Sequence, residues 1–200
     1  YRETIQKGVE REGVFERQVA SGPAFAAIKL RAEPHTSEQS ITIKNGLKPG
    51  TLAPELEKIL LQTLDAEAKG GGTVGYPLMH VRFTVLAVQQ RQGETNDIAI
   101  QAATAAAVRQ TLEDAGPVLL EPIMKLEVVT PEDFLGNITG DLNSRRAIIM
   151  NTEIRGNLIV LHVEAPLSEM FGYSTQVRSL SQGRASYSME FLRYDAAPPE

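Results

Sequence analysis

Hydrophobic and polar positions along residues 1–118 follow two patterns that together predict an α+β unit. Three segments alternate between apolar and polar side chains, as half-buried strands do: residues 24–34, 40–46 and 79–88. Two other segments repeat leucine, isoleucine or alanine at helical spacing and stop at glycine: residues 52–69 and 98–115. The predicted order of elements is strand, strand, helix, strand, loop, helix.

Residues 119–200 follow a different order, β-α-β-β-α-β. Alternation predicts four strands: residues 122–130, 147–154, 157–165 and 184–194. The two helices follow Thr130 and Pro166 along the chain. This is the order of the ferredoxin-like split βαβ fold, in which four antiparallel strands are backed by two helices on one face. The other face of the sheet is then expected to be open to a neighbour.

Side-chain chemistry refines these expectations for the second part of the chain. Thr130 is expected to cap the first helix, with Pro131 at the first helical position and Asp133 three residues after the cap. The second helix, residues 167–180, is expected to pack five apolar side chains on the sheet: Leu167, Met170, Phe171, Val177 and Leu180. The last strand is expected to turn four side chains inward: Ala185, Tyr187, Met189 and Phe191.

Composition narrows the class of protein. With 42% hydrophobic and 22% charged residues, the chain has an ordinary globular composition. It contains no cysteine, which excludes disulfides and thiolate metal sites and agrees with a reducing cytoplasm. Its net charge of −5 argues against a free-standing nucleic-acid-binding protein, although local arginines could still contact RNA. No apolar run reaches the roughly 18 residues of a membrane span, and no methionine starts the chain, so we expect a cytoplasmic segment of a longer protein.

Few residues offer catalytic or metal-binding chemistry. The glycine triplet at 70–72 is expected to end a helix and begin a flexible loop, because no Gly-Lys-Ser/Thr follows it. Glu132 and Asp133 lie in the first turn of a predicted helix, where the helix dipole favours negative charge. The histidines are scattered, as those of a core or sheet face are: His35, His80 and His162. We therefore expect no catalytic residue and no metal site.

One face of the helix predicted at residues 167–180 is polar, and two interpretations explain this. Opposite its apolar side chains, the helix at 167–180 and the residues after it carry small polar groups and one arginine: Ser168, Thr175, Arg178, Ser179 and Gln182. Such a face is either a solvated surface or a surface that contacts RNA phosphates and sugars. The spacing of these residues leaves both interpretations open.

Several segments resemble signature segments of the elongation factor G family. They are YRETI at 1–5, LLEPIMK at 119–125, GDLNSRR at 140–146, PLSEMFGYS at 166–174 and VRSLSQGRASYSMEF at 177–191. The resemblance to domain V of that family is nearly continuous from residue 117 to 195. The resemblance to domain IV covers residues 1–117 more loosely, and is clear at GYPLMHVRFT, residues 75–84.

This resemblance implies two domains with a mechanical rather than a chemical role. Residues 1–118 would form a domain IV-like arm with the ribosomal protein S5 domain 2-like fold, and residues 119–200 a ferredoxin-like domain V. In the family, the tip loops of the arm follow tRNA and mRNA in the decoding region. Domain V lies near the large-subunit RNA that activates the GTPase. The implied partner is ribosomal RNA of both subunits, bound by a monomer.

The resemblance also places the expected contacts. In the tip loops they are Ser21, Gly22, Gln90, Arg91, Gln92 and Gly93. In the domain V-like part they are Arg178, Ser179, Gln182, Gly183 and Arg184. No Walker A sequence (Gly-x4-Gly-Lys-Ser/Thr) occurs here, so we expect neither a cofactor nor enzymatic activity in this chain. GTP and Mg²⁺ would be bound by the full-length GTPase.

Two tip segments depart from the family pattern. Residues 19–26, VASGPAFA, stand where the family usually has a glycine-rich segment with an arginine. Residues 89–97, QQRQGETND, lack the histidine usual in the second loop, and Arg91 is their only cation. These changes favour a paralogue that acts in translocation or, with ribosome recycling factor, in splitting ribosomes. Neutral drift in an exposed loop is the alternative explanation.

Two other functions stay open. A ribosomal protection protein of the tetracycline-resistance kind uses such an arm to dislodge a drug, and the segment FERQVASGPAFAAIKL at 15–30 slightly resembles those proteins. A small-molecule-binding regulatory module on a ferredoxin-like fold is the other alternative. That module predicts a ligand at the edge of the sheet, whereas RNA docking predicts an affinity that falls with salt.

Overall fold

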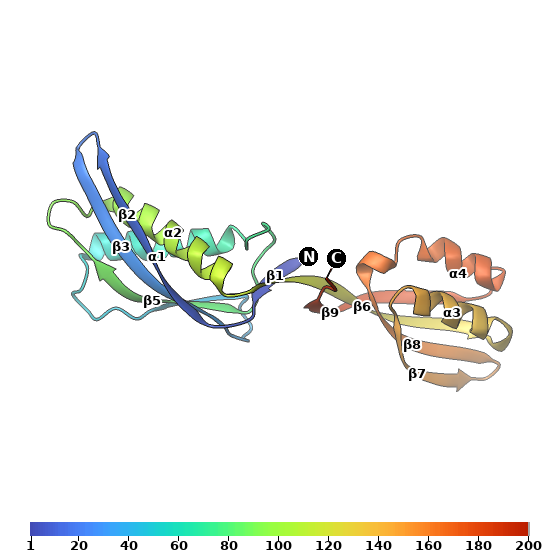
Figure 1. Cartoon of the computed structure of the whole chain (residues 1–200). Coiled ribbons are helices and arrows are strands. Elements are labelled where there is room, and N and C mark those ends of the chain that lie inside the picture. The colour runs from blue at the N-terminus through green and yellow to red at the C-terminus, as the bar shows by residue number, and fades with distance from the viewer. Residues whose placement is uncertain (200) are drawn as a thin grey trace. The chain divides into compact units, whose positions relative to one another are not determined.

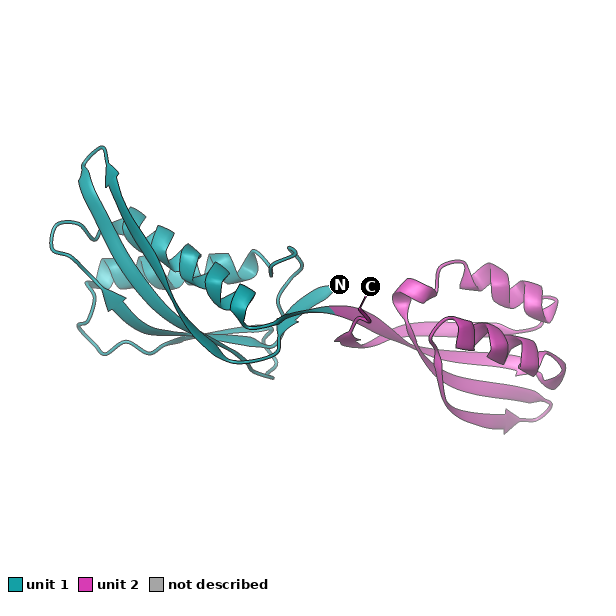
Figure 2. Cartoon of the chain, viewed as in Figure 1, with its two compact units in different colours: residues 1–119 teal, residues 120–200 magenta. Residues whose placement is uncertain are grey.

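The computed structural model describes residues 1–199 and contains two compact units (Figure 1, Figure 2). Unit 1 is Tyr1–Leu119 and unit 2 is Leu120–Glu200. Helices and strands occur in both units, which confirms the α+β class. No helix of the described residues is long and apolar enough to cross a membrane.

Unit 1 is built on a four-stranded sheet in the order β2-β3-β5-β4. The strands are β2 (Val9–Val19), β3 (Gly22–Pro34), β4 (Ile41–Asn45) and β5 (Val81–Gln89), preceded by β1 (Arg2–Ile5). Strands β2, β3 and β5 pair antiparallel, and β4 pairs parallel with β5. Helices α1 (Pro54–Lys69) and α2 (Asp97–Asp114) cover one face of this sheet (Figure 1). The three strands and two helices expected from the sequence are therefore present.

The hydrophobic pattern did not predict β1 or β2. Strand β2 lacks alternation because only Val9 and Gly13 are buried in it, and most of its other positions are polar or charged. Its position depends instead on continuous pairing with β3, from Val9 opposite Ala32 to Val19 opposite Gly22. A strand whose burial is this low is visible only once its partner is known.

Close packing of β2 on α2 explains why that helix is rich in alanine. A Cβ atom at Gly13 would lie 2.2 Å from the carbonyl oxygen of Ala103 and 2.3 Å from the backbone nitrogen of Ala107. The backbones of strand and helix are therefore in direct contact, which only glycine on the strand and small residues on the helix permit. The rest of the core lies between sheet and helices: Ile28, Leu30, Leu60, Leu64, Phe83, Val85 and Ile100.

Unit 2 has the predicted ferredoxin-like arrangement. Its strands are β6 (Pro117–Pro131, which begins in unit 1), β7 (Ile148–Arg155), β8 (Leu158–Pro166) and β9 (Ser186–Ala196), in the spatial order β9-β6-β8-β7. All three pairings are antiparallel. Helices α3 (Leu135–Ser144) and α4 (Tyr173–Ser181) lie on the same face of the sheet (Figure 1). Leu126, Val128, Ile138, Leu142 and Val163 form the centre of the core.

The expected cap at Thr130 is wrong. Strand β6 continues through Pro131, whose φ of −60° and ψ of 149° are extended, and α3 starts at Leu135 after a 3₁₀ turn at Glu132–Phe134. The hydroxyl of Thr130 donates to the carbonyl oxygen of Pro131 at 2.9 Å instead of accepting from the helix. Proline fixes φ but not ψ, so Pro131 could close the strand as well as open a helix.

The helix expected at 167–180 is shorter than predicted. A 3₁₀ turn at Leu167–Glu169 ends before Gly172, whose φ of +74° interrupts the helix, and α4 begins at Tyr173. Met170 and Val177 are buried as expected. Phe171 is 83% exposed and Leu167 is 37% exposed, so neither packs on the sheet, because the left-handed residue turns the chain between them and α4.

The inward row expected on the last strand is correct only at its beginning. Ala185 is buried and Tyr187 packs on the core, but Met189 and Phe191 are 38% and 53% exposed. Helix α4 has nine residues and β9 has eleven, so the helix is about 14 Å long and the strand about 36 Å. The helix is too short to cover the far part of β9.

Candidate nucleic-acid interface

The residues expected to contact RNA in unit 2 lie together where α4 ends. Arg178 and Ser179 are on its last turn, and Gln182, Gly183 and Arg184 follow directly; all five are exposed. Gln182 and Gly183 have φ angles of 54° and 78°, so the chain leaves the helix through two left-handed residues. The Gly183 amide donates to the Arg178 carbonyl oxygen at 2.8 Å, which closes the helix end.

A hydrogen bond under this turn fixes its position on the core. The buried hydroxyl of Ser181 donates to the carbonyl oxygen of Val177 at 2.6 Å and accepts from the amide of Ala185 at 3.0 Å. The turn is therefore attached to the core on its inner side and exposes only polar groups on its outer side.

Charge pairing separates two arginines of unit 2 from the other four. Arg145, Arg146, Arg155 and Arg193 each form an ion pair with an aspartate or glutamate. Among the residues that the structure describes, neither Arg178 nor Arg184 has such a partner. Arg184 lies over the ring of Phe134, with 5.7 Å between its Cζ and the ring centroid. The two arginines of unit 2 that have no ion pair among the described residues are thus both in the predicted contact set.

A groove runs beside Arg178, between α4 and the edge strand β9. Its volume is about 500 Å³, and its polar lining includes the hydroxyl groups of Ser174 and Ser186 and the side chain of Arg178. Hydroxyl groups and arginine are the groups that contact phosphate and sugar in protein–nucleic acid interfaces. The groove therefore extends the polar surface at the end of α4 toward the sheet.

The two expected tip loops of unit 1 lie at one end of that unit (Figure 1). Ser21 lies in the turn between β2 and β3, where Val19 pairs with Gly22, and Gly22 has a φ of +122°. The second loop, residues 90–96, joins β5 to α2 and contacts β3, because the Phe25 amide donates to the Glu94 carbonyl oxygen at 2.9 Å. The structure thus places both expected tip loops at the same end of unit 1.

Arg91, the expected cation of the second loop, is engaged within the protein. Its Nη1 lies 2.8 Å from Oε1 of Glu16, and its Cζ lies 3.8 Å from the ring centroid of Phe25. The hydrogen bond to Glu16 raises the pKa of the Arg91 guanidinium above its ordinary value. This side chain therefore has a structural partner that the sequence did not indicate.

Arg17 is a cation at the same end that the sequence pattern missed. It is exposed, two residues before the turn, and its Cζ lies 5.5 Å from the ring centroid of Phe15. Within residues 1–199 it forms no ion pair with a carboxylate. The sequence did not indicate this position because it did not predict strand β2, and the pairing of β2 with β3 is what places Arg17 beside the tip.

The glycine triplet forms part of a site that is already filled by the protein's own carboxylate. Glu3 is 2% exposed, and it accepts hydrogen bonds from the amides of Val74 and Tyr76 at 3.1 and 2.8 Å and from the Thr73 hydroxyl at 3.3 Å. The loop after α1 is therefore held by Glu3 and is not the free loop expected from the sequence. Its amides are not available to a phosphate.

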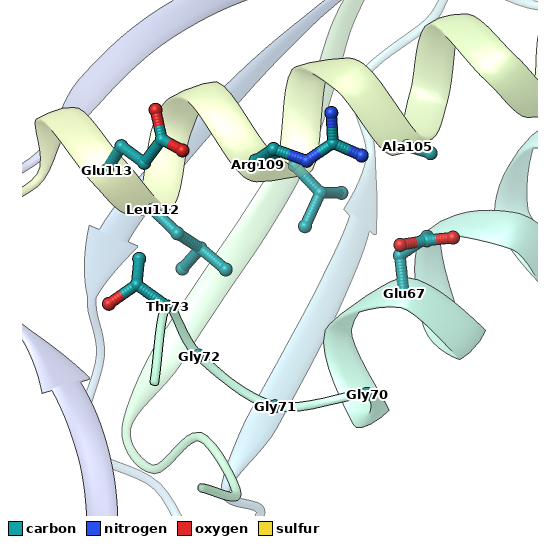
Figure 3. Close-up of a pocket in the computed structure, with 10 residues that line it drawn as sticks. Glu67, Gly70, Gly71, Gly72, Thr73, Ala105, Arg109, Leu112 and Glu113 are labelled. Atoms are coloured by element: carbon teal, nitrogen blue, oxygen red, sulfur yellow. The ribbon is translucent and has the colours of Figure 1, made fainter. Parts of the chain in front are cut away.

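A hollow of about 300 Å³ lies between this loop and α2 (Figure 3). Glycines of the loop, Thr73 and the α2 residues Arg109, Leu112 and Glu113 line it. The hollow is on the helix side of unit 1, whereas a ligand at the edge of the ferredoxin-like sheet was the expectation for a small-molecule module.

The histidines lie on sheets and in loops. His162 is on β8, with Nε2 2.9 Å from Oε1 of Glu153 on the neighbouring strand β7. The amide of His35 donates to the carbonyl oxygen of His80 at 2.9 Å. No group of three or more histidine, aspartate or glutamate side chains in the described part of the chain is placed to hold a metal ion.

Ion pairs cover the sheet face of unit 2 that the helices leave open. Arg155 pairs with Glu127 and Glu153, and Arg193 pairs with Glu164 through both carboxylate oxygens, at 2.9 and 3.1 Å. These hydrogen bonds with arginine hold the pKa of Glu164 below its ordinary value. The arginines of this face are therefore neutralised within unit 2.

Comparison with known proteins gives the same relatives for both units. A family model described as "Elongation factor G, domain IV" matches residues 1–116, and one described as "Elongation factor G C-terminus" matches residues 118–200. Elongation factor G of Thermotoga maritima is 41% identical over 204 residues, and that of Thermotoga neapolitana is 40% identical. Each match covers 99% of this chain and 29% of the relative.

A solved structure supports the fold. A crystal structure of a protein from Thermus thermophilus matches 99% of this chain with a TM-score of 0.81 and 30% sequence identity. The matched region is 30% of that protein. The chain thus spans less than a third of the length of the relatives that it matches.

Proposed function

Because the chain belongs to the elongation factor G family, we propose that it is the ribosome-docking part of a translational GTPase. Unit 1 is the arm that follows tRNA and mRNA in the decoding region. Unit 2 docks on ribosomal RNA of the large subunit. The protein works in the cytoplasm as a monomer, and the full-length protein binds GTP and Mg²⁺ outside this chain.

One observation carries the proposal for unit 2. Of its six arginines, the two without an ion pair in residues 1–199 are Arg178 and Arg184, and both flank the turn after α4. An arginine whose guanidinium is not paired with a carboxylate keeps its donors available, and beside small polar groups it is suited to phosphate contacts. Ser179 and Gln182 supply polar side chains and Gly183 a backbone without a side chain, so a partner can approach the backbone closely there.

The residues at the tip of unit 1 favour the proposal that this protein is a specialised member of the family. Of the two arginines at this tip, Arg91 is paired with Glu16, whereas Arg17 on β2 has no ion pair within residues 1–199. This arrangement differs from the glycine-rich segment and histidine loop that the family usually has at residues 19–26 and 89–97. We propose that the full-length protein acts in tRNA–mRNA translocation or, with ribosome recycling factor, in the splitting of post-termination ribosomes.

The test uses the full-length protein that contains this chain, in a purified translation system. Translocation and splitting by recycling factor are measured side by side with the same preparation. Splitting without translocation identifies a recycling paralogue, and translocation identifies a translocase with an altered tip. Activity in neither assay, together with relief of tetracycline inhibition, would replace this proposal by ribosomal protection.

A further inference from the structure

The second tip loop is attached to one residue of β3 by both backbone and side-chain contacts. The amide of Phe25 donates to the Glu94 carbonyl oxygen at 2.9 Å. The hydroxyl of Thr95 donates to the Phe25 carbonyl oxygen at 2.7 Å and accepts from the Arg91 amide at 3.0 Å. The loop therefore closes on itself through Thr95 and is fixed on the strand at Phe25.

The side chain of Arg91 completes this attachment. Its guanidinium lies on the Phe25 ring, 3.8 Å from the centroid, and reaches Glu16 on β2 at 2.8 Å. The ring is 6% exposed, so the guanidinium and the loop cover it. Stacking on an aromatic face and pairing with a carboxylate both favour one orientation of the planar guanidinium. Arg91 thus connects the loop to two strands.

We propose that Arg91 is a positioning residue, which holds residues 91–95 in one conformation before the tip meets nucleic acid. This inference rests on the proposed function of unit 1. Within the loop, Gln92 and Gly93 are exposed, and a Cβ at Gly93 would meet no atom within 4 Å. We call the contacts of Arg91 and Thr95 with Phe25 and Glu16 the clamp. The residues that the clamp presents, Gln92 and Gly93, are uncharged, and the Arg91 guanidinium is already neutralised by Glu16.

At the tip of unit 1, Arg17 and not Arg91 is then the residue that contacts phosphate. Successive residues of a strand point to opposite faces, so Glu16 turns toward Arg91 while Arg17 points the other way. A phosphate that bound Arg91 would have to displace the Glu16 carboxylate. At Arg17 no carboxylate of the described residues has to be displaced.

A loop that is ordered before binding has an energetic advantage for such a task. Each residue that must be ordered during binding reduces the net gain from its contacts, so a loop ordered in advance binds with less loss. Misplacement of a positioning group by about 1 Å can slow a step by about 100-fold. Loosening the clamp should therefore slow the step that the tip serves, even when no charge changes.

The experiment compares variants of the full-length protein with and without a change in charge. Thr95→Val and Phe25→Leu loosen the clamp and keep every charge, Glu16→Gln and Arg91→Gln remove the ion pair, and Arg17→Gln removes the free cation. Arg109→Gln, on an exposed part of α2, is the matched control for loss of one positive charge. Three quantities are measured: hydrogen exchange of amides 91–95 in the free protein, the rate of translocation or splitting, and the salt dependence of ribosome binding.

A positioning role predicts a specific combination of results. Thr95→Val, Glu16→Gln and Arg91→Gln all accelerate exchange in the loop by about tenfold or more and slow the functional step. The double variant of Glu16→Gln and Arg91→Gln is no slower than Arg91→Gln alone, because the ion pair is already broken in that single variant. Arg91→Lys, which keeps the charge but lacks the planar group that stacks on Phe25, restores only part of the rate. The slope of log affinity against log salt falls by about one for Arg17→Gln and not for Arg91→Gln.

Two outcomes overturn the inference, and they differ in what they say of the proposed function. If Arg91→Gln lowers the salt slope by about one while Glu16→Gln and Thr95→Val leave the rate unchanged, Arg91 contacts phosphate directly, and the arm keeps its proposed function. If the loop opens in every clamp variant while rate and salt slope stay unchanged, including for Arg17→Gln, the tip does not meet nucleic acid. In that case both the positioning role and the proposed function of unit 1 fail.

Discussion

Arg146 binds both carboxylate oxygens of Glu121, at 2.9 and 3.2 Å. Glu121 is 3% exposed, while the guanidinium also reaches Glu169 on the exposed side, at 3.2 Å. The hydrogen bonds with Glu121 raise the pKa of Arg146 above its ordinary value. Arg146 has a left-handed φ of 56°, so the backbone after α3 is turned to bring this side chain to the carboxylate.

Removal of this arginine should strongly destabilise unit 2. Arg146→Ala leaves the Glu121 carboxylate buried without its partner. Because the Arg146 side chain is itself 39% exposed, the loss should be smaller than the roughly 3–5 kcal/mol of a fully buried pair but larger than the roughly 1 kcal/mol of an exposed one. Urea unfolding, monitored by a probe in unit 2, measures this loss. Arg155→Ala is the matched control, because Arg155 pairs with Glu127 and Glu153 at 57% exposure, and such pairs contribute about 1 kcal/mol or less. Equal losses in the two variants would contradict the assignment of Glu121 as a buried carboxylate.

Tyr173 should make the stability of unit 2 depend on alkaline pH. Burial raises the pKa of its phenol from 10.0 to about 12, and the nearby Asp141 carboxylate adds to the effect. Between those pH values the unfolded chain loses the proton and the folded chain keeps it. Stability is therefore complete below pH 10 and falls as the pH rises toward 12, by about 2–3 kcal/mol in all.

Tyr173→Phe isolates this contribution. The variant keeps the ring that packs edge-on against Tyr187, with 5.0 Å between centroids. In residues 1–199 no side chain or backbone group forms a hydrogen bond with the Tyr173 hydroxyl. At pH 7 the variant should unfold within about 1 kcal/mol of the parent chain. Its stability should then change less than that of the parent between pH 10 and 12, and identical pH profiles would refute the assignment.

Gly72 should not tolerate a side chain, because Glu3 occupies the space next to it. A Cβ there would lie 2.5 Å from Oε1 of Glu3. Gly72→Ala must therefore displace either the loop or the buried carboxylate, and overpacking of this kind costs about 1–3 kcal/mol. Gly140→Ala in α3, where a Cβ meets nothing within 4 Å, should instead stabilise unit 2 by about 0.5–1 kcal/mol. Thermal unfolding of both variants should show a lower melting temperature for Gly72→Ala and a higher one for Gly140→Ala.

The sequence predicted those elements whose burial alternates or repeats at helical spacing. Phe83 and Val85 on β5 and Leu126 and Val128 on β6 are fully buried, so the period of the apolar residues identified these strands. Strand β2 exposes most of its side chains, and a glycine occupies its closest backbone approach to α2, so no apolar period marks it. Its existence depends on pairing with β3, which is a long-range relation.

Backbone conformation explains the other errors. Pro131 and Gly172 both permit two continuations of the chain, and tertiary packing selected the strand end at one and the left-handed turn at the other. The surroundings of the expected contact residues could be predicted better in unit 2 than in unit 1. The contact set around Arg178 is local in sequence, whereas the environment of Arg91 consists of Glu16 and Phe25, which are distant in sequence. No local pattern could show that Arg91 is already paired.

We propose above that the turn after α4 docks on ribosomal RNA through Arg178 and Arg184, which have no ion pair within residues 1–199. The most direct test is the salt dependence of ribosome binding by the full-length protein, compared between Arg178→Gln and Arg155→Gln. Each variant removes one positive charge, but Arg155 is paired on the open sheet face and Arg178, within residues 1–199, is not. If Arg178 contacts phosphate, the slope of log affinity against log salt falls by about one for Arg178→Gln and stays unchanged for Arg155→Gln. Unchanged slopes in both variants, or an equal fall in both, would contradict it.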